Sequence, residues 1–239
     1  MKSDARIRIN AYIAASTSLS RRASDKAIED KRVLLNGAIA TLGDRVDVND
    51  IVTLDGVTIE PYEKHTTYAL NKPKGYVCSN DDPHAKHFAR SLVKVPEQER
   101  LHSIGRLDKE SEGLILFTTD GYLTERITHP RNHIEKEYYV KATNQITPRD
   151  IKALRSGIID KGEKLRVKSV ELMSNKEALL VLEECKNREI RRMFDSLENP
   201  VLKLVRLRIG GYSMPSNLPQ GSYVRLTDSD LANLTKKID

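Results

Sequence analysis

The segment from Ile104 to Ile115, IGRLDKESEGLI, places an arginine and a carboxylate in a short polar stretch between apolar residues. Arg106 and Asp108 are two positions apart, so in an extended segment their side chains project to the same side. An aspartate beside an arginine stays ionised and can act as a nucleophile or a base. A surface loop with a local ion pair has the same pattern, so spacing alone leaves both interpretations open.

A second candidate segment, residues 185–194 (CKNREIRRMF), has the spacing of an amphipathic helix. Its apolar residues share one face: Ile190, Met193 and Phe194. Arg188 and Arg192 are one turn apart on the outer face, whereas Arg191 lies beside the apolar face and can reach a buried anion. Arginines at a helix start suit phosphate binding, but a solvated basic face explains the pattern equally well.

The third candidate is the predicted strand 136–141, KEYYVK. Adjacent Tyr138 and Tyr139 point to opposite faces of a strand, so at most one of them belongs to any one site. A tyrosine there can stack on a nucleobase, although a buried core aromatic is the more common use.

Metal and nucleotide motifs are weak or absent. Potential metal ligands occur together at Asp81, Asp82, His84 and His87, but Pro83 interrupts them and the stretch is predicted to be a loop. The two cysteines, Cys78 and Cys185, form no CxxC pair, and neither GxxxxGK[ST] nor GxGxxG occurs. These motifs therefore give no support to a metal site or to a nucleotide cofactor.

The elements around these candidates predict a larger α+β domain over residues 68–239. Strands are expected at 68–70, 76–78, 113–117, 136–141, 166–172, 178–183 and 201–209. Thr147 caps a helix that Gly157 ends, and Thr227 with Asp230 caps the last helix. Strands with interspersed helices and no regular βαβ repeat indicate a mixed or antiparallel sheet.

Residues 1–60 form a separate small α/β module, joined by a linker at 61–67 that Pro61 interrupts. Ile9, Tyr12 and Ile13 have helical spacing, and Ser20 can cap a second helix. Asn36-Gly37 between apolar runs predicts a hairpin. Residues 1–32 hold eight basic and four acidic side chains, so positive charge is concentrated in this module.

Composition bounds the function. The chain has 239 residues, a formal net charge of +6 and 38% hydrophobic residues, which fits globular domains and favours a polyanionic partner. The sequence has no apolar run long enough to cross a bilayer and no apolar core of a signal peptide near residue 1. Together with the few cysteines, this predicts a cytoplasmic protein with no membrane partner. We also expect a monomer.

These segments resemble the bacterial pseudouridine synthases of the RsuA/RluB/RluE/RluF type. Four motifs occur in that family's order: residues 71–75 (NKPKG), 105–108 (GRLD), 136–138 (KEY) and 187–193 (NREIRRM). Residues 6–55, with Ser20-Arg21-Arg22 and Leu35-Asn36-Gly37, are similar to an RNA-binding module first described in a small-subunit ribosomal protein. The resemblance covers nearly the whole chain.

The resemblance implies an enzyme that isomerises a uridine of ribosomal RNA and needs no metal and no cofactor. Asp108 matches the essential aspartate, Tyr138 the active-site tyrosine, and Arg191 the arginine that pairs with the aspartate. Arg106 is expected to fill the space left by the flipped nucleotide or to hold a phosphate. The cations expected to contact RNA are Arg6, Arg8, Arg21, Arg22, Lys26, Arg32, Arg188 and Arg192.

Three positions depart from the family pattern. Ala11 replaces a common basic residue, Ser18 a common glycine, and Glu189 a residue that is Gln in several relatives. Two other classes remain as alternatives: a non-catalytic RNA-binding or ribosome-assembly protein, and a fragment of an aminoacyl-tRNA synthetase. The retained Asp108 argues against the first, and the absence of HIGH-like and KMSKS-like motifs argues against the second.

Overall fold

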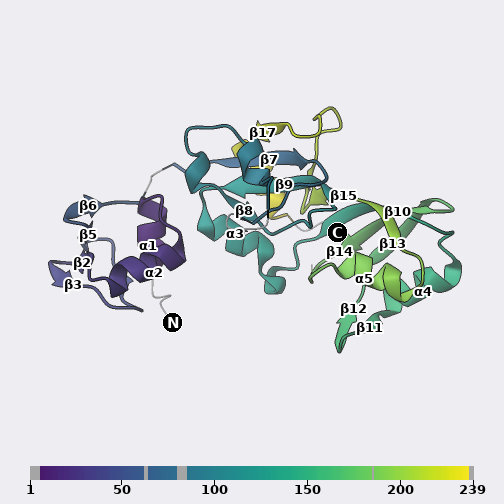
Figure 1. Cartoon of the computed structure of the whole chain (residues 1–239), viewed down its shortest axis with the longest axis horizontal. Helices are drawn as coiled ribbons and strands as arrows, with labels where there is room; N and C mark the ends of the chain where they lie inside the picture. The colour runs from purple at the N-terminus through teal and green to yellow at the C-terminus, as the bar shows by residue number, and fades with distance from the viewer. Residues whose placement is uncertain (1–5, 62–63, 80–84, 185, 237–239) are drawn as a thin grey trace. The chain divides into compact units, whose positions relative to one another are not determined.

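The computed structural model describes residues 6–61, 64–79, 85–184 and 186–236. The chain divides into two compact units, one comprising residues 1–65 with 119–121, the other residues 66–118 and 122–239 (Figure 1). No helix in these described ranges has the length and apolar character needed to span a membrane.

The first unit packs two helices on small antiparallel sheets. Helices α1 (Ile9–Ser16) and α2 (Arg21–Glu29) precede a sheet in the order β3-β2-β5-β6. Its strands are β2 (Val33–Leu35), β3 (Ala38–Ile39), β5 (Val52–Leu54) and β6 (Val57–Ile59), while β1 (Ile7–Arg8) pairs with β4 (Arg45–Val46). Its core contains Ile9 and Ile13, whose helical spacing was noted above, together with buried residues of α2 and the sheet: Ala27, Ile28, Val33 and Val52.

Local chemistry explains two features of this unit. The Ser20 side chain accepts a hydrogen bond from the Ala23 amide, which caps α2 as predicted. Asn36 and Gly37 both have positive φ, 52° and 82°, between β2 and β3, so the predicted hairpin is confirmed.

The second unit is built on a mixed sheet in the order β13-β14-β10-β15-β9-β7-β17. The strands along this path are β13 (Ser169–Ser174), β14 (Glu177–Leu182), β10 (Lys136–Ala142), β15 (Val201–Ile209), β9 (Glu112–Thr118), β7 (Thr67–Lys72) and β17 (Tyr223–Arg225). Strand β8 (His102–Ile104) also pairs with β9, and β16 (Tyr212–Ser213) with β15. The β9–β15 pair is parallel and the others are antiparallel, which confirms the predicted α+β class.

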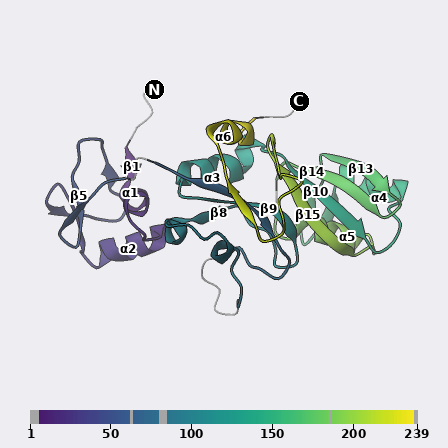
Figure 2. The same cartoon turned by 90° about the horizontal axis from the view of Figure 1, so that it is seen from above.

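Helices cover both faces of this sheet. One apolar cluster includes Leu154 of α4 (Pro148–Ser156) and Met193 and Phe194 of α5 (Glu189–Ser196). The other includes Ile127 of α3 (Gly121–Thr128) and Leu234 of α6 (Asp228–Leu234). Figure 2 shows α3 and α6 on one side of the sheet and α5 on the other. The central strands are therefore buried on both faces and fix the residues at their ends.

Short elements complete the unit. Hairpin β11 (Ile158–Asp160) and β12 (Glu163–Leu165) follows α4, and three 3-10 turns lie at η1 (Ala89–Leu92), η2 (Gln98–Arg100) and η3 (Pro130–Asn132). The capping boxes predicted at Thr147 and Thr227 are both present. Residues 76–78 form no strand, contrary to prediction: Val77 makes only an isolated bridge to Phe88.

Candidate active site

A cavity of about 600 Å³ opens in the second unit where the central strands meet the loops that precede β9 and α5. All three sequence candidates contribute to its wall. Arg106 and Asp108 come from the loop before β9, Tyr138 from β10, and Arg188 from the start of α5. Arg106 is exposed at this site and Asp108 is half-buried.

The loop that carries Asp108 is held by its neighbours in three places. Gly105 turns the chain after β8 with a φ of 70°. The Leu107 amide donates a hydrogen bond to Cys78 Sγ at 3.4 Å, and the Gly75 amide donates to the Lys109 oxygen at 2.8 Å. The chain on either side of Asp108 is therefore fixed against residues 75–78.

The turn at residues 73–76 is itself supported by a buried cation. Lys72 is fully buried, and its Nζ donates to the main-chain oxygens of Pro73 and Tyr76 at 3.0 and 2.9 Å. Burial lowers the pKa of Lys72, and the field of nearby acids, including Asp108, opposes this shift. Lys74 of the same turn pairs with Glu110 at 2.9 Å.

Arg188, and not Arg191, forms the ion pair with Asp108. The Nη1 of Arg188 lies 3.8 Å from Asp108 Oδ2, and the Asp108 side chain is 31% exposed. Arg188 stands immediately before α5 with a φ of 49°, a left-handed conformation. The pair expected between Arg191 and Asp108 is therefore wrong as a direct contact. A residue predicted only to contact RNA lies nearest to the carboxylate.

Arg191 instead joins backbone segments under the site. It is buried, its Nη1 donates to the Val201 oxygen at 3.1 Å, and its Nη2 donates to the Glu110 oxygen at 3.0 Å. Burial lowers its pKa, as does the charge of Arg188, while Asp108 and Glu110 act in the opposite direction. Arg191 thus ties the loop of Asp108 to the start of β15 and still contributes its charge to the site.

Arg192 has a structural position rather than the exposed one predicted. Its side chain is 16% exposed, and it pairs with Asp160 and Glu163 of the β11–β12 hairpin. The outer-face placement failed because the sequence does not show that this hairpin lies beside α5. The guanidinium is occupied by two carboxylates, so Arg192 is not retained as an RNA contact.

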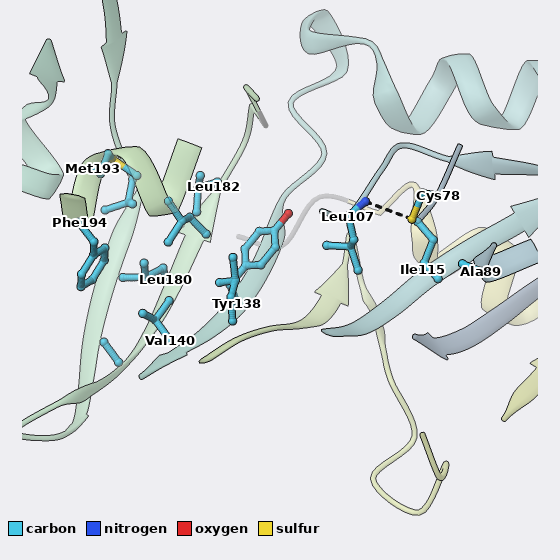
Figure 3. Close-up of a cluster of buried hydrophobic side chains, with 14 of the residues drawn as sticks. Cys78, Ala89, Leu107, Ile115, Tyr138, Val140, Leu180, Leu182, Met193 and Phe194 are labelled. Atoms are coloured by element: carbon cyan, nitrogen blue, oxygen red, sulfur yellow. Dashed lines mark hydrogen bonds between the residues drawn. The ribbon is translucent and has the colours of Figure 1, made fainter. Parts of the chain in front are cut away.

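Tyr138 forms part of the cavity floor. It is 5% exposed on β10, opposite Leu180 of β14 and Arg206 of β15. Figure 3 shows its ring between Leu180 and Leu182 on one side and Leu107 on the other. The neighbouring Tyr139 points to the opposite face, as strand geometry requires, and does not line the cavity.

Three charged residues of the cavity wall were not among the predicted site residues, although Glu189 was noted as a departure from the family pattern. Lys136 and Arg206 are buried cations, and Glu189 is a buried acid. Glu189 accepts a hydrogen bond from the Lys186 amide at 2.9 Å, and desolvation raises its pKa. Lys136 could have been found because it shares a strand face with Tyr138. Arg206 could not, because a bulge sets its direction.

In the first unit the predicted RNA-binding cations fall into two groups. Lys26 pairs with Asp30 at 2.8 Å and Arg32 pairs with Asp55. Arg8, Arg21 and Arg22 are exposed and form no ion pair with any residue that the structure describes; Arg6 is also exposed.

The predicted absence of a metal site is not tested as a whole. Asp81, Asp82 and His84 lie outside the described residues, as does Cys185. Within the described part of the chain, no group of three or more His, Cys, Asp or Glu side chains could hold a metal ion.

Comparison with known proteins decides the family. Residues 66–196 match the model of the RNA pseudouridylate synthase family, and residues 7–52 match the S4 domain. The chain belongs to the RNA pseudouridine synthase family. Its enzyme class is therefore that of an isomerase, and the S4 domain precedes the catalytic unit, as the resemblance in the sequence predicted.

Individual relatives agree over nearly full length. The chain is 36% identical to an uncharacterized RNA pseudouridine synthase of Borreliella burgdorferi, over 97% of this chain and 94% of the relative. It is 37% identical to the dual-specificity RNA pseudouridine synthase RluF of Escherichia coli, over 100% and 82%. A ribosomal small subunit pseudouridine synthase A of Haemophilus influenzae is 34% identical, over 96% and 100%.

The fold agrees as well. A crystal structure of a pseudouridylate synthase superposes with a TM-score of 0.72 at 32% identity, covering 95% of this chain and 99% of that chain.

Proposed function

We propose that this pseudouridine synthase acts on ribosomal RNA, where it converts a specific uridine to pseudouridine with Asp108 at the reaction centre. The observation that carries the proposal is the convergence of Arg106, Asp108, Tyr138 and Arg188 on one cavity. The ribosomal substrate is supported by relatives such as the small subunit synthase of Haemophilus influenzae.

The reaction detaches uracil from C1′ of the ribose, turns it, and rejoins it through carbon five. A target base stacked in folded RNA must first leave the stack, which costs a few kcal/mol. Arg106, exposed at the cavity mouth, fills the vacated space or holds a phosphate. Tyr138 supplies a buried aromatic face against which the flipped base stacks.

Asp108 acts on the ribose or on the base as an ionised carboxylate. The Nη1 of Arg188 lies 3.8 Å from Oδ2 of this carboxylate and pairs with it. Arg191 has a positioning role because it holds the Glu110 oxygen and the Val201 oxygen on either side of the site. Carbon five loses its proton when it bonds to C1′, and N1 of the detached ring gains one, so the isomerisation balances without a metal or a cofactor.

RNA affinity is assigned largely to the module at residues 1–60, linked through 61–67 to the catalytic domain at 68–239. The proposed phosphate contacts in the module are Arg6, Arg8, Arg21, Arg22, Lys26 and Arg32, joined by Arg188 in the catalytic domain. Such contacts make binding depend on salt. We further propose that the protein is a cytoplasmic monomer, in line with its few cysteines.

The test is to map pseudouridines in ribosomal RNA from cells that contain or lack this protein, and to restore either the wild type or Asp108→Ala. We expect one site or a small set of sites to disappear without the protein and to return only with the wild type. A site restored equally by Asp108→Ala would remove Asp108 from the chemistry. An unchanged map would refute ribosomal RNA as the substrate.

A further inference from the structure

The floor of the cavity contains an arginine that none of the roles above uses. Arg206 lies on β15, is 3% exposed, and lines the same cavity as Asp108 and Tyr138. Its Nε donates to the main-chain oxygen of Leu114 at 2.7 Å. Its Nη2 is buried and has no hydrogen-bond partner among the described residues.

A β-bulge aims Arg206 at the cavity. On β15, Arg208 is opposite Glu137 and Arg206 is opposite Tyr138, so Leu207 is an extra residue in the register. Bulges change the direction of a side chain and occur often beside active sites. Because of this one, Arg206 shares the face of Tyr138, although Arg208 is only two positions away and faces the other side with Glu137.

The two arginines differ in how their charge is balanced. Arg208 donates to Glu137 at 2.8 Å and to Glu135 at 3.4 Å. Arg206 has no carboxylate within ion-pair distance in the described part of the chain. A buried cation destabilises the unliganded protein when no acid pairs with it and one of its N–H donors has no acceptor. Such a group is well suited to an acceptor that a ligand brings into the cavity.

The depth of Arg206 decides which acceptor fits. A phosphate stays with the RNA backbone and meets the exposed cations at the rim, Arg106 and Arg188. The flipped base goes deeper, to Tyr138, which is the cross-strand neighbour of Arg206. Uracil carries two carbonyl oxygens on its ring, and an arginine side chain has donors only.

We propose that Arg206 donates a hydrogen bond to a carbonyl oxygen of the flipped uracil and so selects the base that enters the cavity. The proposal rests on the function proposed above, in which Tyr138 stacks on that base. It makes Arg206 a recognition residue that touches the substrate, with no proton transferred from its guanidinium.

A double-mutant cycle on protein and RNA tests this hydrogen bond. Binding is measured without turnover, by comparing Asp108→Ala with the double variant Asp108→Ala/Arg206→Met. The probes are three RNA fragments around the mapped site, which carry uridine, cytidine or 2-thiouridine there. Cytidine replaces O4 by an amino group and 2-thiouridine replaces O2 by sulfur, so each removes one carbonyl acceptor.

With Arg206 present, one of the two replacements is expected to weaken binding about tenfold, the effect of one hydrogen bond to a charged donor. With Met at this position the same replacement is expected to cost less than about twofold, because the donor and the acceptor act as a pair. Equal penalties in both proteins would overturn the proposal, since a purely structural arginine weakens all three RNAs alike.

Arg208→Met is the matched control, from the same strand but the opposite face, and it should leave the ratios between the RNAs unchanged. Thermal unfolding checks that each variant is folded. If Arg206→Met does not fold, the cycle is run with Arg206→Lys, which keeps the charge but loses the planar fork, and its coupling should still fall. A failed cycle with wild-type pseudouridine formation intact refutes only the role of Arg206. An unchanged pseudouridine map in cells that lack the protein refutes the proposed function.

Discussion

The two units of this protein use their cations in opposite ways. In the S4 unit, Arg8, Arg21 and Arg22 are exposed to solvent. In the catalytic unit, the buried cations Lys72, Lys136, Arg191 and Arg206 donate mainly to backbone oxygens. Exposed charges act through the long-range field that attracts a polyanion. Burying a cation costs desolvation free energy, which is offset only where the cation fixes neighbouring backbone groups or binds a ligand.

This contrast predicts that substitutions in the first unit alter affinity and those in the second alter turnover. The largest effect is expected for Asp108→Ala. Pseudouridine formation should be abolished, because the carboxylate assigned to the reaction is gone. RNA affinity should stay within about tenfold, or ~1.4 kcal/mol, since many cations share the binding. Tritium release from labelled uridine together with equilibrium binding measures both.

Asp108→Asn is a matched control that keeps the shape of the side chain. Equal loss of activity with both variants assigns the effect to the negative charge. Appreciable turnover by either variant contradicts a chemical role for Asp108.

The second prediction separates three arginines at the start of α5. Arg191→Met should lower turnover strongly and stability moderately, because the Glu110 and Val201 oxygens lose their donor. Arg192→Met should lower stability with turnover retained, since it breaks the ion pairs with Asp160 and Glu163. Single-turnover rates and urea unfolding of the same samples separate the two effects.

Arg188→Met provides the contrast within this series. It removes the cation 3.8 Å from Asp108, so turnover should fall while the free energy of unfolding changes little, because Arg188 is exposed. Unchanged turnover for Arg188→Met, or equal loss of turnover for Arg191→Met and Arg192→Met, would contradict these assignments.

Helix α5 shows which features of the site the sequence can predict. Periodicity predicted α5 and its buried residues Ile190, Met193 and Phe194, because helical spacing is a local property. The motifs also identified Arg106, Asp108 and Tyr138 as site residues, and all three line one cavity. The sequence did not predict which acid each arginine pairs with. Arg188 pairs with Asp108 because its own backbone is left-handed at the position before the helix. Arg192 pairs with a carboxylate of a hairpin that lies about thirty residues earlier in the chain.

Arg206 shows the same limit for strands. Simple alternation places Arg206 and Arg208 on one face of β15, yet the bulge at Leu207 separates them. A bulge depends on the partner strand, which the sequence alone does not reveal. Fold class and motif order are thus accessible from sequence, whereas the direction of a charged side chain requires its tertiary neighbours.

The third prediction tests the exposed cations of the S4 unit. Replacing Arg21 and Arg22 together by Ser should flatten the dependence of log affinity on log salt by about 0.7–0.9 for each phosphate that is no longer neutralised. The matched control replaces Lys26 and Arg32 by Ser. It changes the net charge equally but removes cations that are already paired with Asp30 and Asp55. It should flatten the slope less. Equal slopes for the two variants would show that pairing does not decide which cations bind RNA.

The smallest effect is expected for Glu189→Gln, a change of charge at nearly constant shape. Burial raises the pKa of Glu189 above its ordinary value, and the hydrogen bonds from the Lys186 and Arg166 amides only partly oppose this. The folded state therefore binds the proton more tightly than the unfolded state. The resulting stability is fully present below the unfolded pKa and is lost as pH rises through the folded pKa.

Glutamine is neutral throughout this range, so the free energy of unfolding of Glu189→Gln should gain relative to wild type as pH rises from about 4 to 7.5. Urea unfolding at both pH values measures the difference, and Glu198→Gln, at an exposed position, controls for a change of net charge alone. A gap that stays constant with pH would mean that Glu189 is as easily ionised in the folded protein as in the unfolded chain. Its carboxylate would then belong with the solvated charges of the first unit rather than with the buried ones of the second.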